Sequence, residues 1–268
     1  MIKYIIIALT LIALVAGYYF YNLEHGLYAA DVQPFLIYYG GVDNNASLSE
    51  LQPVISEFKD YPIVIFGSAI HFPSAAAKIR SALTKTLLYG YADTNNVTWN
   101  HVKSRLDTLS AMKFNGVLFD GVGAGWSADP NNIKQAVRYA HSQNLRVIIN
   151  DWNPETAMNV GLAPGKDGYS AENWVFSDGQ WQNPPLPTSS YDGLHELESQ
   201  GIKIFMIVTM HGSNFTGRQI LDPIKETIKQ ESGNYISVSG EYYSAQSNAI
   251  FPANELRQVI RMALTPSS

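Results

Sequence analysis

The chain has 268 residues, a length that corresponds to one or two domains of usual size. Its 18 lysine and arginine residues against 23 aspartate and glutamate residues give a net charge of −5, which argues against a nucleic-acid-binding protein with a basic face. Hydrophobic residues make up 46 %, enough for a large core, so wholesale disorder is excluded. Cysteine is absent, which excludes disulfide scaffolds, thiol catalysis and cysteine-bound metals.

An uncharged apolar stretch runs from Tyr4 to about Asn22, directly after Lys3. A membrane-spanning helix needs about 20 apolar residues, so the stretch is just long enough to be one. A cleaved signal peptide is the alternative, although no clear small-residue cleavage site follows the apolar core. We expect residues 1–30 to be a signal anchor with a short linker. Both alternatives place the rest of the chain outside the cell.

From residue 31 onward, short apolar runs alternate with segments of helical periodicity. Eight runs are apolar on both faces, which is typical of parallel strands that are buried on two sides. The predicted strands are Phe35–Tyr39, Pro62–Phe66, Thr86–Ala92, Gly116–Asp120, Leu145–Asn150, Asn173–Phe176, Lys203–Val208 and Tyr235–Ser239.

Helix signals lie between these runs. Ser47 and Glu50 form a capping-box pattern, and Asp129 is an N-cap residue in front of a first-turn proline, Pro130. The Asp167–Thr188 region, which is rich in proline towards its end, is expected to be a long loop after the sixth strand. Repeated strand–helix alternation predicts an α/β protein, a (β/α)8 TIM barrel over residues 31–268. A doubly wound open sheet is the alternative, but it would normally have a glycine-rich phosphate loop after an early strand.

Carboxylates gather at the ends of the predicted strands, where a barrel of this kind carries its chemistry. They are Asp93, Asp120, Asp151, Asp178 and Glu241, and tryptophans and tyrosines accompany them. Acids beside aromatic rings are typical of sugar chemistry, because one acid protonates the leaving oxygen, another supports the cationic centre, and flat rings stack on sugar faces. A rim acid can also simply cap the next helix, and for most single positions that is the simpler interpretation. Asp120 differs, because it ends a fully apolar strand and a glycine-rich segment follows it.

Other types of site find less support in the sequence. His71 and His211 lack the HxH or HExxH spacing of metal sites, and neither a GxSxG elbow nor a Walker loop occurs. We therefore expect no metal and no cofactor.

Several of these strand-end segments resemble the spherulation-specific family 4 proteins, which are close to the endo-α-1,4-polygalactosaminidase-like (β/α)8 glycoside hydrolases. The likeness covers Phe35 to Asn254 in order. Three segments resemble short motifs of the family: LLYGYADT is similar to G-Y-x-x-T, FNGVLFDGV to G-I-F-F-D-E, and NWVFSDGQW to V-V-F-E. Two more segments, VIINDWNPET and TMHG, resemble the family's fifth and seventh strands.

The resemblance implies that Asp120 is catalytic and that the substrate is a galactosamine-type polymer. Two positions depart from the family's pattern. The acid pair on the fourth strand is Asp-Glu in the family and Asp120-Gly121 here, and the family's glutamate on the sixth strand falls on Ser177, with Asp178 one place later.

Two hypotheses follow. The first is an exported, membrane-anchored glycoside hydrolase that acts on an amino-sugar-containing surface or biofilm polysaccharide. In it, Asp120 would be the nucleophile, base or charge stabiliser, and Asp178 or Glu241 would be the acid. The residues expected to bind the sugar are Tyr91, Asp93, Trp126, Asn150, Asp151, Trp152, Trp181 and His211. The second hypothesis is a non-catalytic glycan-binding or cell-surface structural protein that has kept the barrel and lost its acid pair.

Overall fold

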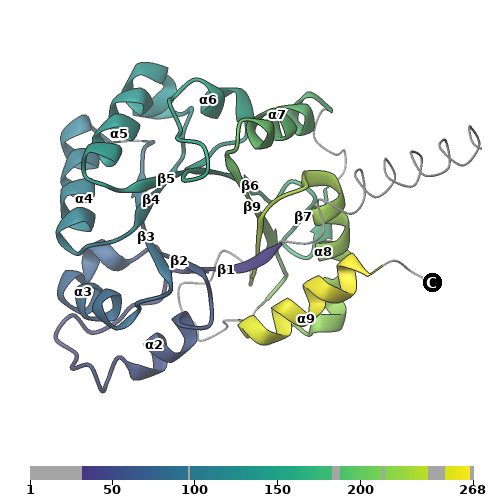
Figure 1. Ribbon diagram of the computed structural model, residues 1–268, viewed down its shortest axis with the longest axis horizontal. Helices are drawn as coiled ribbons and strands as arrows, with labels where there is room; N and C mark the ends of the chain where they lie inside the picture. The colour runs from purple at the N-terminus through teal and green to yellow at the C-terminus, as the bar shows by residue number, and fades with distance from the viewer. Residues whose placement is uncertain (1–31, 96, 183–187, 213–214, 241–250, 266–268) are drawn as a thin grey trace, which may run out of the picture. The chain divides into compact units, whose positions relative to one another are not determined.

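The structure is a computed structural model that describes residues 32–95, 97–182, 188–212, 215–240 and 251–265. Eight parallel strands close into a barrel in the order β1-β10-β9-β6-β5-β4-β3-β2 (Figure 1). Pairing of Gln33 with Tyr235 joins the first strand to the last. The (β/α)8 architecture expected from the sequence is therefore confirmed, and an open sheet is excluded. The strands are β1 (Gln33–Tyr38), β2 (Ile63–Phe66), β3 (Leu87–Asp93), β4 (Gly116–Asp120), β5 (Arg146–Asn150), β6 (Gly168–Glu172), β9 (Lys203–Thr209) and β10 (Tyr235–Ser239).

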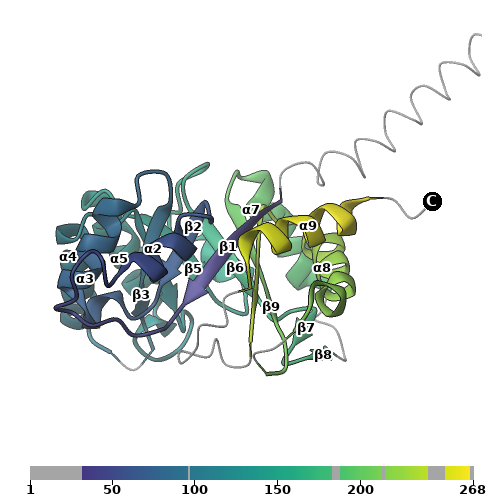
Figure 2. The ribbon, with the colours of Figure 1, turned by 90° about the horizontal axis from the view of Figure 1, so that it is seen from below.

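Helices surround the barrel on the outside (Figures 1 and 2). They are α2 (Gln52–Phe58), α3 (Pro73–Ala82), α4 (Trp99–Ala111), α5 (Pro130–Ser142), α6 (Pro154–Met158), α7 (Thr188–Ser199), α8 (Gly217–Glu231) and α9 (Ala253–Leu264), with short 3-10 turns η1 (Ala69–His71) and η2 (Gly125–Ala128). Asp129 caps α5 as predicted, whereas the hydrogen-bonded Ser47–Glu50 pair lies in a turn before α2, whose N-cap is Leu51. The Asp129 carboxylate accepts the Asn131 N–H at 2.9 Å, and Glu50 Oε2 accepts the Ser47 N–H at 2.7 Å.

Apolar side chains fill the inside of the barrel, which is why most strands carry no alternating polar face. The cluster includes Phe35 and Phe205, whose rings meet edge to face at 5.2 Å, together with branched residues from neighbouring strands. This packed interior holds the strands in place and so fixes the positions of the residues at their carboxyl ends.

The sixth barrel strand lies earlier in the chain than predicted. Strand β6 ends at Glu172, directly before the predicted segment Asn173–Phe176, and part of the expected long loop is therefore strand. The residues that follow form a small antiparallel hairpin outside the barrel, β7 (Phe176–Ser177) with β8 (Gln180–Trp181). Its two-residue turn, Asp178-Gly179, has φ values of +50° and +75°, the left-handed backbone that tight hairpins require.

Two of the sequence predictions fall on residues that the structure does not describe. The signal anchor expected over residues 1–30 lies outside the described ranges, and so does Glu241. Within the described ranges, none of the helices has the length and apolar character that crossing a membrane requires.

Glu231, the last residue of α8, is a fully buried carboxyl group. Neither of its oxygens has a hydrogen-bond partner among the described residues, and the same holds for the nearby Tyr191 hydroxyl and Thr227 Oγ1. Burial raises the pKa of Glu231 well above its usual range. The group is therefore protonated in the folded protein over a range of pH in which it is ionised in the unfolded chain.

This difference makes stability depend on pH. The free energy of unfolding should fall as pH rises from about 4.3, the usual carboxyl pKa, up to the raised pKa of Glu231. We expect Glu231→Gln, whose amide does not titrate, to lose that fall and to melt at a higher temperature than the wild type at about pH 8. Thermal unfolding between about pH 4 and pH 8 measures this, with Glu226→Gln on the same helix as control. Identical pH slopes in Glu231→Gln and the wild type would contradict the prediction.

Candidate active site

Four neighbouring strands end in a polar side chain at the same edge of the barrel. They are β3 with Asp93, β4 with Asp120, β5 with Asn150 and β6 with Glu172, and each follows a mostly buried run. The parallel register places Asp93 opposite Asp120. Because the carboxyl ends of parallel barrel strands meet at one mouth, three carboxylates and one amide form a continuous row there.

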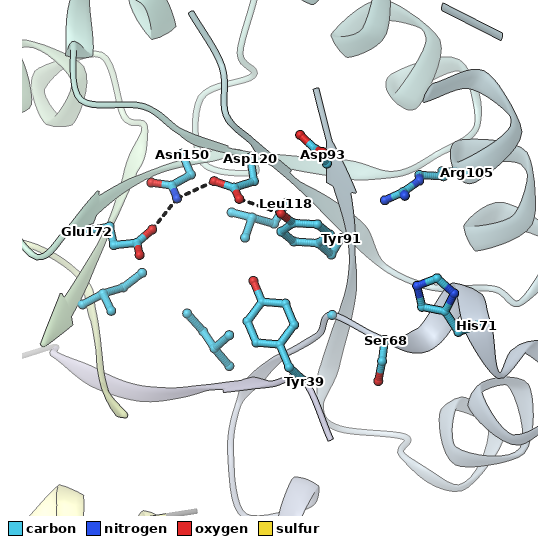
Figure 3. Close-up of a pocket in the computed structure, with 13 residues that line it drawn as sticks. Tyr39, Ser68, His71, Tyr91, Asp93, Arg105, Leu118, Asp120, Asn150 and Glu172 are labelled. Carbon is cyan, nitrogen blue, oxygen red and sulfur yellow. Dashed lines mark hydrogen bonds between the residues drawn. The ribbon is translucent and has the colours of Figure 1, made fainter. Parts of the chain in front are cut away.

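One amide joins two of these acids. The Nδ2 group of Asn150 donates to Asp120 Oδ1 at 2.8 Å and also to Glu172 Oε2 (Figure 3). The two carboxylate oxygens therefore lie at most two hydrogen-bond lengths apart, which is an upper limit of about 6 Å. The second oxygen of Asp120, Oδ2, accepts the Tyr91 hydroxyl at 2.6 Å. Both oxygens of Asp120 thus face donors, the pattern that suits an ionised carboxylate.

Two cavities share this acid group. The larger, of about 600 Å³, also reaches Tyr39 and Asp93. The smaller, of about 240 Å³, lies against Trp152 and Trp174. Both are lined by Asp120, Asn150 and Glu172. A ligand that spans the two cavities would place its middle at the acid pair.

Two phenols border the acids. Tyr39 follows β1, and burial, reinforced by the negative charges of Asp120 and Glu172, raises its pKa. Burial and the hydrogen bond to Asp120 raise the pKa of Tyr91, whose ring meets that of Tyr39 edge to face at 5.6 Å. Both hydroxyls therefore keep their protons at neutral pH and are donors within the larger cavity.

Asp151 and Trp152 belong to the smaller cavity, as expected for residues that would bind a sugar. Burial raises the pKa of Asp151, and its Oδ2 is buried with no hydrogen-bond partner in the described part of the chain. The side chain of Trp152 is a contrast, because this residue is 63 % exposed. A buried polar atom and an exposed flat ring therefore lie side by side in the sequence at this cavity.

Four other predicted residues do not line either cavity. Trp126 stacks on Trp99 with ring centroids 6.3 Å apart, and Trp181 packs edge to face on Phe176. The exposed Asp178 and His211 form a loose pair at the hairpin, with 3.5 Å between Oδ1 and Nδ1. The structure thus brings together Asp93, Asp120, Tyr91, Asn150, Asp151 and Trp152 from the predicted set.

Glu172 is the carboxylate that the sequence prediction missed. The sequence puts the sixth strand on the apolar run after Glu172, and the family resemblance puts the glutamate of that strand at Ser177, next to the acid candidate Asp178. Both positions belong to the hairpin. An Asp-Gly pair between two short segments is a recognised hairpin signal, and it would have moved the strand to the earlier segment. The Gly121 departure has a backbone cause, because φ there is +67° and an added Cβ would lie 3.1 Å from Asn95 Cβ.

Comparisons with known proteins support the fold. A scan of protein-family models finds no match for the sequence, and a search of curated proteins finds none. Among solved structures, the glycoside hydrolase domain of PelA from Pseudomonas aeruginosa has a TM-score of 0.51 at 13 % identity, covering 76 % of this chain and 94 % of its own. A 3-keto-L-gulonate-6-phosphate decarboxylase from Vibrio cholerae has a TM-score of 0.53 at 11 % identity, covering 88 % and 100 %. A 3-hexulose-6-phosphate synthase has a TM-score of 0.51 at 15 % identity, covering 85 % and 99 %. At these identities the likeness shows the barrel alone, a fold that serves several chemistries.

Proposed function

We propose that this protein is a glycoside hydrolase that cleaves a polysaccharide at the mouth of its barrel. The observation that carries the proposal is the bridge from Asp120 through Asn150 to Glu172, which holds two carboxylates a short distance apart between two cavities. Hydrolysis of a glycosidic bond needs such a pair of carboxyl groups, together with a water molecule that is consumed in the reaction.

The spacing favours a retaining mechanism, in which the two carboxyl groups stand about 5–5.5 Å apart. Asp120, with donors at both oxygens, would attack the anomeric carbon as the carboxylate and form a glycosyl-enzyme ester. Glu172 would protonate the departing glycosidic oxygen and then, as the base, take a proton from the water that cleaves the ester. In this assignment Glu172 takes the role that the sequence alone gave to Asp178 or Glu241.

The proposed substrate class is an amino-sugar-containing, galactosaminan-type polysaccharide outside the cell. The resemblance to the polygalactosaminidase-like hydrolases supports it, and so does the row of three carboxylates, which would attract protonated amino groups. The apolar stretch before residue 31 supports export of the barrel, with that stretch as its membrane anchor.

The test is to incubate the full-length protein with a panel of polysaccharides that includes polygalactosamine, and to score binding and release of reducing ends together. Release that depends on Asp120 is the expected result. Binding without release from any polymer would favour the second hypothesis, a glycan-binding protein with this fold, and would sink the assignment of a hydrolase.

Trp152→Ala should weaken the binding of oligosaccharides from the polymer that the panel identifies by about 3–10-fold, because an exposed indole supplies a stacking surface for a sugar face. The melting temperature should hardly change, since the ring contributes little to the core. Isothermal titration of the variant against wild type measures the effect. The control is Trp181→Ala, which removes an indole that is 51 % exposed from the hairpin, and equal losses in both variants would refute a specific role for Trp152.

A further inference from the structure

One end of the larger cavity is lined by the carboxylates, and the other end carries a positively charged side chain. Arg105, on α4, and His71, on η1, line it together with the acids. Figure 3 shows Arg105 and His71 on the side of the cavity away from Glu172. The topology agrees, because β2, which leads into η1, and β6, which carries Glu172, are separated by three strands in either direction around the barrel.

The guanidinium of Arg105 includes a nitrogen that has no acceptor in the described part of the chain. Its Nε is buried and has no hydrogen-bond partner among the described residues. No ion pair links Arg105 to a carboxylate in that part of the chain, Asp93 included, whose Oδ1 instead accepts the Asn95 N–H at 2.8 Å. Because Arg105 also lines the cavity, a ligand there can supply an acceptor to the accessible end of the guanidinium, which has none among the described residues.

The neighbouring groups can complete an anion site. The imidazole of His71 can donate a hydrogen bond from a ring N–H. The Ser68 hydroxyl donates to Gly40 O at 2.6 Å, so it forms part of the wall without offering its proton. Arg105 is therefore the principal donor, and its planar fork matches a carboxylate or a phosphate with two parallel hydrogen bonds.

We propose that this end of the cavity binds an anionic substituent of the polysaccharide, on a sugar unit next to the one that is cleaved. The inference rests on the proposed function and adds to its substrate class: the amino-sugar polysaccharide would also carry acidic units, with a uronate carboxylate or a phosphate ester as the anion. Acids at one end and a cation at the other also give the bound chain a fixed direction across the barrel mouth.

The experiment measures binding by isothermal titration with matched pairs of probes. Galacturonate oligomers are compared with their methyl esters, glucose 6-phosphate with glucose, and polygalactosamine serves as the cationic polymer. The charged member should bind about 10–100-fold more tightly than its neutral partner at low salt, and the preference should shrink at high salt. Whichever pair shows the larger preference identifies the carboxylate or the phosphate ester.

Variants assign the effect to Arg105. Arg105→Gln should abolish the preference for the charged probes, and Arg105→Lys should keep only part of it, because a lysine lacks the fork. Arg138→Gln, which removes an exposed arginine from α5, should leave the preference unchanged. Melting temperatures confirm that each variant is folded.

Equal affinity for charged and neutral probes, no binding of any anionic probe, or an unchanged preference in Arg105→Gln would each overturn the proposal. Failure of the anion-site proposal can be distinguished from failure of the glycoside hydrolase proposal. Arg105-dependent binding of acidic probes without cleavage of any polymer would sink the glycoside hydrolase and keep the anion site. Cleavage of polygalactosamine at the same rate by wild type and Arg105→Gln, with no charge preference, would keep the glycoside hydrolase and overturn the anion site.

Discussion

Replacing Asp120 by asparagine should reduce hydrolysis by at least about 10³-fold, because the carboxylate that attacks or stabilises the anomeric carbon is lost while its shape is kept. The melting temperature should stay close to that of the wild type. The side chain lies at the rim, and an asparagine can accept the Asn150 N–H with its oxygen and donate its own amide N–H to the Tyr91 hydroxyl, which can also accept. Initial rates on the polymer identified by the panel, together with a thermal unfolding curve, measure both effects.

Asp178→Asn is the matched control, since it makes the same change in an exposed aspartate on the hairpin turn. We expect it to keep nearly all of the activity. Full activity in Asp120→Asn would overturn the central assignment. Unfolding of Asp120→Asn would show that the acid holds Tyr91 and Asn150 in place for structural reasons.

Replacing Glu172 by glutamine should have an effect that depends on the leaving group. Removal of a general acid costs about 10²–10⁴-fold when the departing sugar oxygen needs a proton. An aryl glycoside with a good leaving group needs no such proton, so its first step should lose far less. The ratio of the two rate losses, measured as kcat/KM for polymer and for nitrophenyl glycoside, separates an acid from a nucleophile.

A uniform loss on both substrates would contradict the role of Glu172 as the acid and would exchange the roles of Glu172 and Asp120. Ser177→Gln, which places the same amide at the position that the family resemblance suggested, is the control. It should leave both rates close to wild type, because Ser177 lies in the hairpin and not at a barrel strand end.

The barrel could be predicted because its signal is local and repeated. A strand buried on both sides is a continuous apolar run, and seven of the predicted runs coincide with barrel strands to within two residues at each end. The sixth strand escaped this rule. Its sequence, Gly168–Glu172, contains a tyrosine, a serine and a small alanine, so it is less apolar than the Asn173–Phe176 run that follows. The more hydrophobic segment belongs to the irregular chain and hairpin beyond the strand.

The candidate site could be predicted only where a residue ends a recognisable strand. Asp93, Asp120 and Asn150 meet that condition. Glu172 could not be predicted because its strand was not recognised in the sequence. Nothing in the sequence marks Arg105 as a site residue, because it is one of several charged residues on an amphipathic helix. Its place in the cavity depends on how α4 packs against β3 and η1, which is a property of the tertiary structure.

The link from Asp120 to Glu172 passes through strand ends, and this has a consequence for how the site can change. The spacing of the two acids is set by the hydrogen-bonded register of β4, β5 and β6, in which Phe119 pairs with Ile149 and Asn150 with Ser170. The segments that follow these strands carry Trp152 and the hairpin, and they are not part of that ladder. Exchanging such a segment for one of another length should therefore alter which sugars are accepted and leave the distance between the acids intact. Specificity can thus be redesigned by changing single loops, while the barrel strands keep the carboxylates of Asp120 and Glu172 in place.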